Sequence, residues 1–191
     1  FSPGLAERLV ADDRMTELGG QRKMVSVLFA DVTGFTTLVD INTVEDVVEV
    51  LNRFFETVVP IIFKHGGMLD KFLGDGVMAI FGIPDAEETD PMRAIACAVD
   101  IQKGMQHLRK DLERDGLFSI TVGIGIATGI VFAGNIGTKD QMNYTVIGEP
   151  VNLAQRLESI SAPGEIIISN VTSENIPEGT DLDVSFEPMG A

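Results

Sequence analysis

The sequence predicts an α+β fold with a ferredoxin-like core, an antiparallel sheet whose helices cover one face. Three observations lead to this fold class. Short apolar runs rich in β-branched residues are typical of strands. Two longer segments with apolar residues at helical spacing predict the helices that connect them. A Gly-Asp turn predicts a hairpin between the second and third strands, so the order is β-α-β-β-α-β, followed by additional strands and helices.

The predicted elements begin after a polar N-terminal stretch. We expect residues 1–20 to form a helical linker from an upstream regulatory module, and residues 21–191 to form the folded domain. Both ends are expected to be cut from a longer protein. Strands are predicted over residues 24–30, 68–73, 76–82, 118–127, 130–136 and 165–169, with the fourth and fifth as a hairpin, and helices over 43–64, from Asp90 onward and over 150–159.

Local signals mark the ends of these elements. Asn42 followed by Glu45 has capping-box spacing at the start of the first helix. Asp90-Pro91 places a proline in the first turn of the second helix. Directly after the first strand, a turn is predicted over Thr33, Gly34, Phe35 and Thr36.

Composition excludes several classes of protein. The 191 residues are 45% hydrophobic, which indicates one globular domain. The formal net charge of −15 argues against nucleic-acid binding, which needs a basic face. No apolar run is long enough to cross a bilayer and no secretory signal opens the chain, so we expect a cytoplasmic fragment without membrane contact. The single cysteine, Cys97, excludes an intrachain disulfide.

Two acidic side chains are predicted to meet at one end of the sheet. Asp31 ends the first strand, Asp75 lies at the hairpin tip, and the ferredoxin-like order makes these strands neighbours. Paired carboxylates offer the hard oxygen ligands that Mg²⁺ or Mn²⁺ requires. Aspartate is also common in turns, so a structural role is the alternative for either residue alone. The turn at Gly34 adds backbone N–H groups that could hold phosphate oxygens.

Asn152 and Arg156 stand four residues apart on the last predicted helix, so their side chains share one face. An arginine beside an asparagine could clamp a pentavalent phosphate. The alternative, which these two residues alone favour, is an ordinary solvated helix face.

Four segments, in order, resemble the catalytic domain of class III adenylate and guanylate cyclases in its bacterial form, which has a palm-type core. They read VLFADVTGFT (27–36), HGGMLDKFLGDGVMAIFG (65–82), VGIGIATG (122–129) and IGEPVNLAQRL (147–157). Any one segment could match by chance, whereas four in family order are specific. The resemblance extends over roughly residues 20–190.

The resemblance implies a metal and phosphate site. Asp31 and Asp75 match the two metal-binding aspartates, and the carbonyl of Val32 would add a ligand, so two Mg²⁺ or Mn²⁺ ions per active site are implied. The triphosphate would be held by the backbone of Gly34, Phe35 and Thr36.

The resemblance also implies a shared active site. Lys71 and Thr145 match the base-recognition pair, Asn152 matches the residue that positions the ribose, and Arg156 matches the arginine that stabilises the transition state. In the family one chain supplies the aspartates and its partner supplies these four residues. Because this chain has both sets, a homodimer with two equivalent sites is implied.

The implied reaction is attack of the ribose 3′-oxygen of ATP on the α-phosphorus, which gives 3′,5′-cyclic AMP and pyrophosphate. Lys71 only donates hydrogen bonds and the Thr145 hydroxyl can accept one, which suits N1 and the 6-amino group of adenine. Guanylate cyclases resemble this site with Glu in place of Lys71. The wrong purine would leave buried polar groups unpaired at a cost of roughly 1–3 kcal/mol each.

Three alternatives remain at this point. Lys71 disfavours a guanylate cyclase, and a diguanylate cyclase is disfavoured because Leu73-Gly-Asp-Gly76 stands where its Gly-Gly-Asp/Glu-Glu-Phe hairpin would be. The third is a catalytically weak, cyclase-like module that only dimerises or senses nucleotide. Two departures from the family bear on it: no Arg stands near Gly123, and no Lys lies near the C-terminal end where the family has one that reaches the triphosphate.

Overall fold

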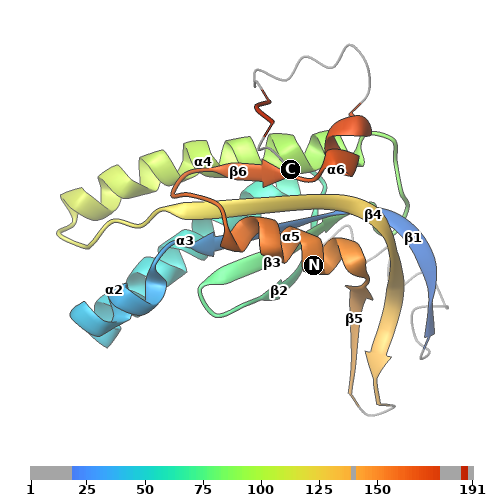
Figure 1. Ribbon diagram of the computed structural model, residues 1–191. Coiled ribbons are helices and arrows are strands. Elements are labelled where there is room, and N and C mark those ends of the chain that lie inside the picture. Colours follow the sequence, from blue (N-terminus) through green and yellow to red (C-terminus); the bar gives the residue numbers. More distant parts are fainter. Residues whose placement is uncertain (1–18, 139–140, 177–185, 189–191) are drawn as a thin grey trace.

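The computed structural model describes residues 19–138, 141–176 and 186–188. Of the helical linker predicted over residues 1–20, residues 1–18 lie outside the described residues, whereas Gly19 and Gly20 already belong to the first strand, which corrects that end of the prediction. Within the described residues a six-stranded sheet has the order β2-β3-β1-β4-β5, and β6 pairs with β4 (Figure 1). β6 runs parallel to β4, whereas the other neighbours are antiparallel. The strands are β1 (Gly19–Val32), β2 (Met68–Phe72), β3 (Gly76–Phe81), β4 (Val122–Gly137), β5 (Met142–Ile147) and β6 (Ile166–Ile168).

The order β4-β1-β3-β2 is that of a ferredoxin-like core, which confirms the predicted α+β fold class. β1 lies at the centre of this core because its apolar run has no polar face. Among the described residues, no helix is both long and apolar enough to span a membrane. The helices are α2 (Phe35–Ile41), α3 (Val44–Lys64), α4 (Asp90–Arg114), α5 (Glu149–Ser159) and α6 (Asn170–Glu174).

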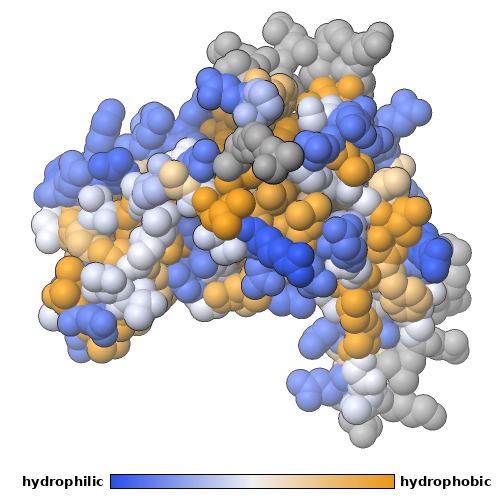
Figure 2. All heavy atoms as spheres, in the orientation of Figure 1, coloured by the Kyte–Doolittle hydropathy of each residue, from blue (hydrophilic) through white to orange (hydrophobic). Residues whose placement is uncertain are grey.

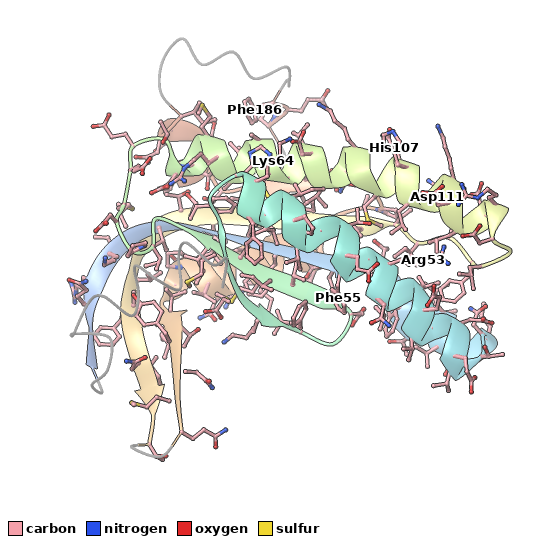
Figure 3. All side chains as sticks on the ribbon, turned by 180° about the vertical axis from the view of Figure 1, so that it is seen from behind. Arg53, Phe55, Lys64, His107, Asp111 and Phe186 are labelled. Atoms are coloured by element: carbon pink, nitrogen blue, oxygen red, sulfur yellow. The ribbon has the colours of Figure 1, made fainter. Side chains whose placement is uncertain are left out.

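The two helices of the ferredoxin-like core cover one face of the sheet, as predicted, and the additional helix α5 covers the other face. α3 and α4 lie side by side across one face (Figure 3), and α5 lies on the other (Figure 1). Leu28 and Ala30 of β1 belong to the core cluster on the α3 and α4 side, and Val27 and Phe29 to the cluster on the α5 side. Alternate side chains of β1 point to opposite faces, so its continuous apolar run fills two cores.

The hairpin predicted over residues 118–127 and 130–136 is wrong, because β4 is one strand. It pairs with β1 without interruption from Val32↔Val122 to Gly19↔Asn135. Gly129, read as part of a turn, pairs with Val25 in the middle of the strand. A Cβ atom at Gly129 would lie 2.6 Å from Cγ of Pro150, so this glycine allows the close approach of α5.

Two local predictions also need correction. The N-cap of α3 is Thr43, whose hydroxyl accepts a hydrogen bond from the Asp46 N–H at 3.2 Å, while the Asn42 amide donates to the Leu38 carbonyl at 2.8 Å. After β1, Thr33 and Gly34 form a turn as predicted, whereas Phe35 and Thr36 already belong to α2, whose N-cap is Gly34. A side chain just outside a helical N-terminus often accepts a hydrogen bond from the first turn, and Thr43 and Asn42 both have suitable chemistry.

Candidate active site

The end of β1 is joined to the turn that carries Asp75. Asp31 pairs with Gly76, the residue after Asp75. The Val32 N–H lies 3.1 Å from Oδ1 of Asp31 and 3.3 Å from the carbonyl oxygen of Asp75. Asp31 and Asp75, predicted from sequence to be neighbours, are therefore held together by backbone pairing.

The two carboxyl groups repel each other. Burial, with the nearby charge of Asp75 as the second cause, raises the pKa of Asp31 to about 6. A divalent cation would relieve this repulsion, and carboxylate oxygens are the ligands that Mg²⁺ and Mn²⁺ prefer. Among the described residues, no group of three or more His, Cys, Asp and Glu side chains is arranged to hold a metal.

Gly76 makes room for the Asp31 carboxylate. A Cβ atom there would lie 2.5 Å from Oδ1 of Asp31 and 2.9 Å from the Ala30 carbonyl oxygen. Sequence reasoning did not single out Gly76, although a glycine directly after Asp75 is the signal that could have found it.

Glu158 is a third acidic group at this end of the sheet. Burial, followed by the charges of Asp31 and Asp75, raises the pKa of Glu158 to about 7. Glu158 lies in the last turn of α5, which passes so close to β4 that a Cβ atom at Gly125 would collide with the backbone of Glu158 and Ala154. The sequence showed Glu158 only as part of a helix face, because the packing of α5 on β4 is a long-range contact.

The predicted phosphate-binding segment begins directly after this acidic group. Gly34 has φ +70°, and its carbonyl accepts hydrogen bonds from the N–H groups of Thr37 (3.1 Å) and Leu38 (3.3 Å). The N–H groups of the first helical turn, including those of Phe35 and Thr36, have no acceptor within an α-helix. The segment thus presents backbone donors beside the two aspartates, as phosphate binding requires.

Lys71 and Thr145 meet from opposite edges of the sheet. Lys71 lies on β2 and Thr145 on β5, which end the strand order, yet Lys71 Nζ donates to Thr145 Oγ1 at 3.2 Å. Four strand spacings would separate these strands by about 19 Å in a flat sheet. The sheet is not flat. In Figure 1 the far half of β4 bends and, together with β5, forms an arm that projects from the body. Because of this bend, β5 lies nearer to β2 than it would in a flat sheet. In Figure 2 the surface is hollowed between the arm and the body.

Asn152 and Arg156 lie exposed on α5, as the helix pattern predicted. Within the described part of the chain their side chains make no hydrogen bond or ion pair with one another or with the aspartates. The structure therefore assembles two local groups, Asp31 with Asp75 and Lys71 with Thr145, and leaves Asn152 and Arg156 free to meet another molecule.

The family model described as "Adenylate and Guanylate cyclase catalytic domain" matches residues 20–188. The chain belongs to this family. The site above is thus part of a class III nucleotide cyclase domain, as the sequence motifs indicated, and the four motif segments all lie in the matched range.

Solved structures similar to this cyclase domain include enzymes for both purines. The guanylyl cyclase Cya2 is 36% identical, with a TM-score of 0.82 over 91% of this chain and 89% of that chain. The adenylyl cyclase CyaB from P. aeruginosa is 38% identical, with a TM-score of 0.79 over 83% of this chain and 82% of that chain. Overall similarity therefore leaves the choice of purine to individual side chains.

Curated relatives are longer than this cyclase domain. The uncharacterized protein Rv1318c of Mycobacterium tuberculosis is 38% identical over 161 residues, which cover 83% of this chain and 28% of that protein. The chain thus spans less than a third of the length of the relatives it matches.

Proposed function

We propose that this domain is an adenylate cyclase that converts ATP to 3′,5′-cyclic AMP and pyrophosphate for signal transduction. We propose ATP rather than GTP as the substrate because Lys71 Nζ donates a hydrogen bond to Thr145 Oγ1 at 3.2 Å. This hydrogen bond supports a single base-reading unit built from a donor and a hydroxyl. Lys71 suits the N1 acceptor of adenine, whereas guanine has an N–H group there.

The proposed reaction proceeds by in-line displacement at the α-phosphorus. A bond forms between the ribose 3′-oxygen and the α-phosphorus, the bond from that phosphorus to the bridging oxygen breaks, and pyrophosphate leaves. Two divalent cations, Mg²⁺ or Mn²⁺, when bound would lower the pKa of the 3′-hydroxyl and neutralise phosphate charge. Asp31, Asp75 and the Val32 carbonyl would hold them, and the 3′-hydroxyl proton would leave to solvent.

The other residues would orient and stabilise the substrate. The backbone of Gly34, Phe35 and Thr36 would hold the triphosphate. Asn152 would position the ribose, and Arg156 would stabilise the charge that develops on the α-phosphate oxygens, because a guanidinium donates two parallel hydrogen bonds to phosphate.

The complete site is proposed to form between two copies of the chain. Asn152 and Arg156 are exposed and make no contact with the aspartates of their own chain, so we infer that both side chains complete the active site of a partner chain.

A large apolar patch supports this association. On one face of the arm and the adjoining β1, four side chains are 43–58% exposed: Met24, Ile130, Phe132 and Ile147. Their strand register places Met24 opposite Ile130 and Phe132 opposite Ile147, and Figure 2 shows apolar surface along the arm.

Product analysis across a protein dilution series tests the proposal. Purified domain with Mn²⁺ should form cyclic AMP from ATP faster than cyclic GMP from GTP, and specific activity should fall on dilution as dimers dissociate. Full specific activity in a monomeric sample would refute the shared site. Absence of any cyclic nucleotide at high protein concentration would instead favour a nucleotide-sensing module.

A guanylate cyclase is the second candidate, favoured by the similarity to Cya2. Preferential turnover of GTP in the same assay would support it. Because the matched region makes up less than a third of the relatives' length, we also propose that a regulatory module precedes this domain in the complete protein.

A further inference from the structure

Asp70 places a buried carboxylate behind the base-reading pair. Its side chain is 0% exposed, its Oδ2 accepts a hydrogen bond from Thr145 Oγ1 at 2.9 Å, and the same oxygen lies 3.1 Å from Lys71 Nζ. Among the described residues its second oxygen, Oδ1, has no hydrogen-bond partner. A half-satisfied buried carboxylate destabilises the fold, so its presence here calls for a role beyond packing.

A β-bulge explains how two consecutive residues reach the same threonine. In a regular strand Asp70 and Lys71 would point to opposite faces of the sheet. The register of β2 against β3 shifts between Leu69, which pairs with Ala79, and Lys71, which pairs with Met78. Asp70 is therefore the extra residue of the bulge, a feature that re-aims side chains beside functional sites.

The hydrogen-bond count at Thr145 then fixes the direction of each bond. A hydroxyl has one hydrogen to donate and two lone pairs. The hydrogen goes to Asp70, since an ionised carboxylate only accepts, and one lone pair receives the Lys71 N–H. Burial raises the pKa of Asp70, whereas the contacts with Lys71 and Thr145 act against burial and favour the ionised form. What remains at Thr145 is a single acceptor.

We propose that Asp70 is a specificity-determining positioning residue: it takes the Thr145 hydroxyl hydrogen, so that Thr145 faces the purine only as an acceptor. This inference rests on the proposed base-reading role of Lys71 and Thr145. An acceptor suits the 6-amino group of adenine and repels the 6-oxo group of guanine. Without Asp70 the hydroxyl could rotate and donate to guanine.

The kinetic test replaces the Asp70 carboxylate, which accepts the Thr145 hydrogen bond, with an apolar side chain of similar volume. Asp70→Leu should lower the ratio of kcat/KM for ATP to that for GTP by about tenfold. Asp70→Asn retains an acceptor oxygen and should keep a larger part of the ratio. In a Thr145→Val background, Asp70→Leu should leave the ratio unchanged. Asp111→Asn is the matched control, since Asp111 is exposed near the end of α4, far from the site (Figure 3).

Two kinetic results would overturn the inference. One is an equal loss of ATP and GTP turnover in Asp70→Leu, which would mean a merely structural role. The other is a change of ratio that is as large in the Thr145→Val background as with the native threonine, since the effect would then bypass the hydroxyl. Thermal unfolding midpoints of all variants show which of them are folded, and only folded variants are compared.

A measurement without substrate separates this inference from the proposed function. Carboxyl NMR titration of the otherwise native chain should give a higher pKa for Asp70 in Thr145→Val than in the wild type, because a hydrogen bond to the ionised form is lost. An unchanged pKa would overturn the role of Asp70 even if Asp70→Leu does not fold. If the wild type prefers GTP, the choice of ATP is wrong, while the titration still tests the Asp70 contact.

Discussion

Burial of carboxylates, followed by their mutual repulsion, governs the residue-scale chemistry at the end of β1. Asp31, Asp75 and Glu158 come from a strand end, a hairpin turn and the last turn of a helix, and burial together with mutual repulsion raises the pKa of Asp31 and Glu158. Neighbouring carboxylates with raised pKa values would gain stability from a bound cation. If Asp31 and Asp75 hold the proposed metal ions, metal binding should stabilise the domain.

Replacement of Asp31 should stabilise the metal-free protein at neutral pH. The pKa of Asp31 rises from 3.8 to about 6 on folding, so its contribution to stability is present below pH 3.8 and is lost as the pH rises through 6. Asp31→Asn cannot ionise, and after discounting for solvent screening it should be about 1–2 kcal/mol more stable than wild type at pH 7.5, with a smaller difference at pH 5. Thermal unfolding in EDTA measures this.

Addition of Mn²⁺ is the complementary measurement for the same variant. It should raise the thermal midpoint of the wild type and have less effect on Asp31→Asn. Asp111→Asn should behave as wild type throughout. A pH-independent difference between Asp31→Asn and wild type would contradict the electrostatic explanation.

Gly76→Ala should disrupt the proposed metal site at Asp31 and Asp75, although it replaces neither carboxylate. Its new methyl group would meet Oδ1 of Asp31 at 2.5 Å and a backbone oxygen at 2.9 Å, so the Asp31 side chain or β3 must move. We expect at least a tenfold loss of cyclase activity, since small displacements of positioned groups have large effects. Gly104→Ala is the control, because its nearest neighbours are side-chain atoms of Ile61 and Thr57 at 3.1 Å. Equal activity of the two variants would refute this steric role.

At the scale of elements, glycines of β4 determine where α5 lies. Side chains at Gly123, Gly125 or Gly129 would collide with Ser161, with the α5 backbone or with Pro150. Their absence lets α5 lie directly against the strand and carries Glu158 to the aspartates. At the other edge, the T-shaped contact of Phe55 on α3 with Phe72, at a centroid distance of 4.6 Å, packs the end of β2 against α3.

Gly129→Ala should displace α5. The added Cβ atom would lie 2.6 Å from Cγ of Pro150, and overpacking of this kind costs about 1–3 kcal/mol. Urea unfolding should show this loss, and cyclase activity should fall because Arg156 moves with α5. Gly104→Ala, whose added Cβ atom would meet only side-chain atoms at 3.1 Å, is the stability control. A wild-type urea midpoint for Gly129→Ala would mean that α5 is held by other contacts.

At the scale of the whole molecule, curvature of the sheet and the proposed association of two chains would together build the complete site. The bend of β4 brings the edges β2 and β5 together, so that Lys71, Asp70 and Thr145 form one group. The exposed helix α5 and the apolar patch on the arm leave surface for a second copy. Two-fold symmetry then makes every contribution reciprocal.

Mixing two inactive variants tests this reciprocity. Asp31→Ala and Arg156→Ala should each be nearly inactive alone, because each destroys both sites of its own homodimer. Random mixing should restore about a quarter of wild-type activity, since half of the dimers are mixed and each has one intact site. Cyclic AMP formation by the pure and mixed samples is the readout, and no recovery despite confirmed subunit exchange would contradict the shared site.

How much could be predicted depends on the range of the interactions. α4 follows from local pattern, because apolar residues at helical spacing, including Ile95, Ala98 and Met105, form its buried face. Asp31 and Asp75 could be paired because strand order alone makes them neighbours. The turn at Gly129 and the cap at Asn42 were wrong, since each has a local signal that a long-range contact or a better neighbouring residue overrides. Glu158 and Asp70 carry no local signal at all.

Strand and helix periodicity, the motif residues and the family follow from the order of amino acids, because these depend on short stretches of chain. Tertiary structure alone decided that β4 runs unbroken past Gly129, that α5 covers the second face, and that a bulge turns Asp70 toward Thr145. Each of these depends on the pairing or packing of residues far apart in the chain, where many local conformations are compatible and only the assembled sheet selects one.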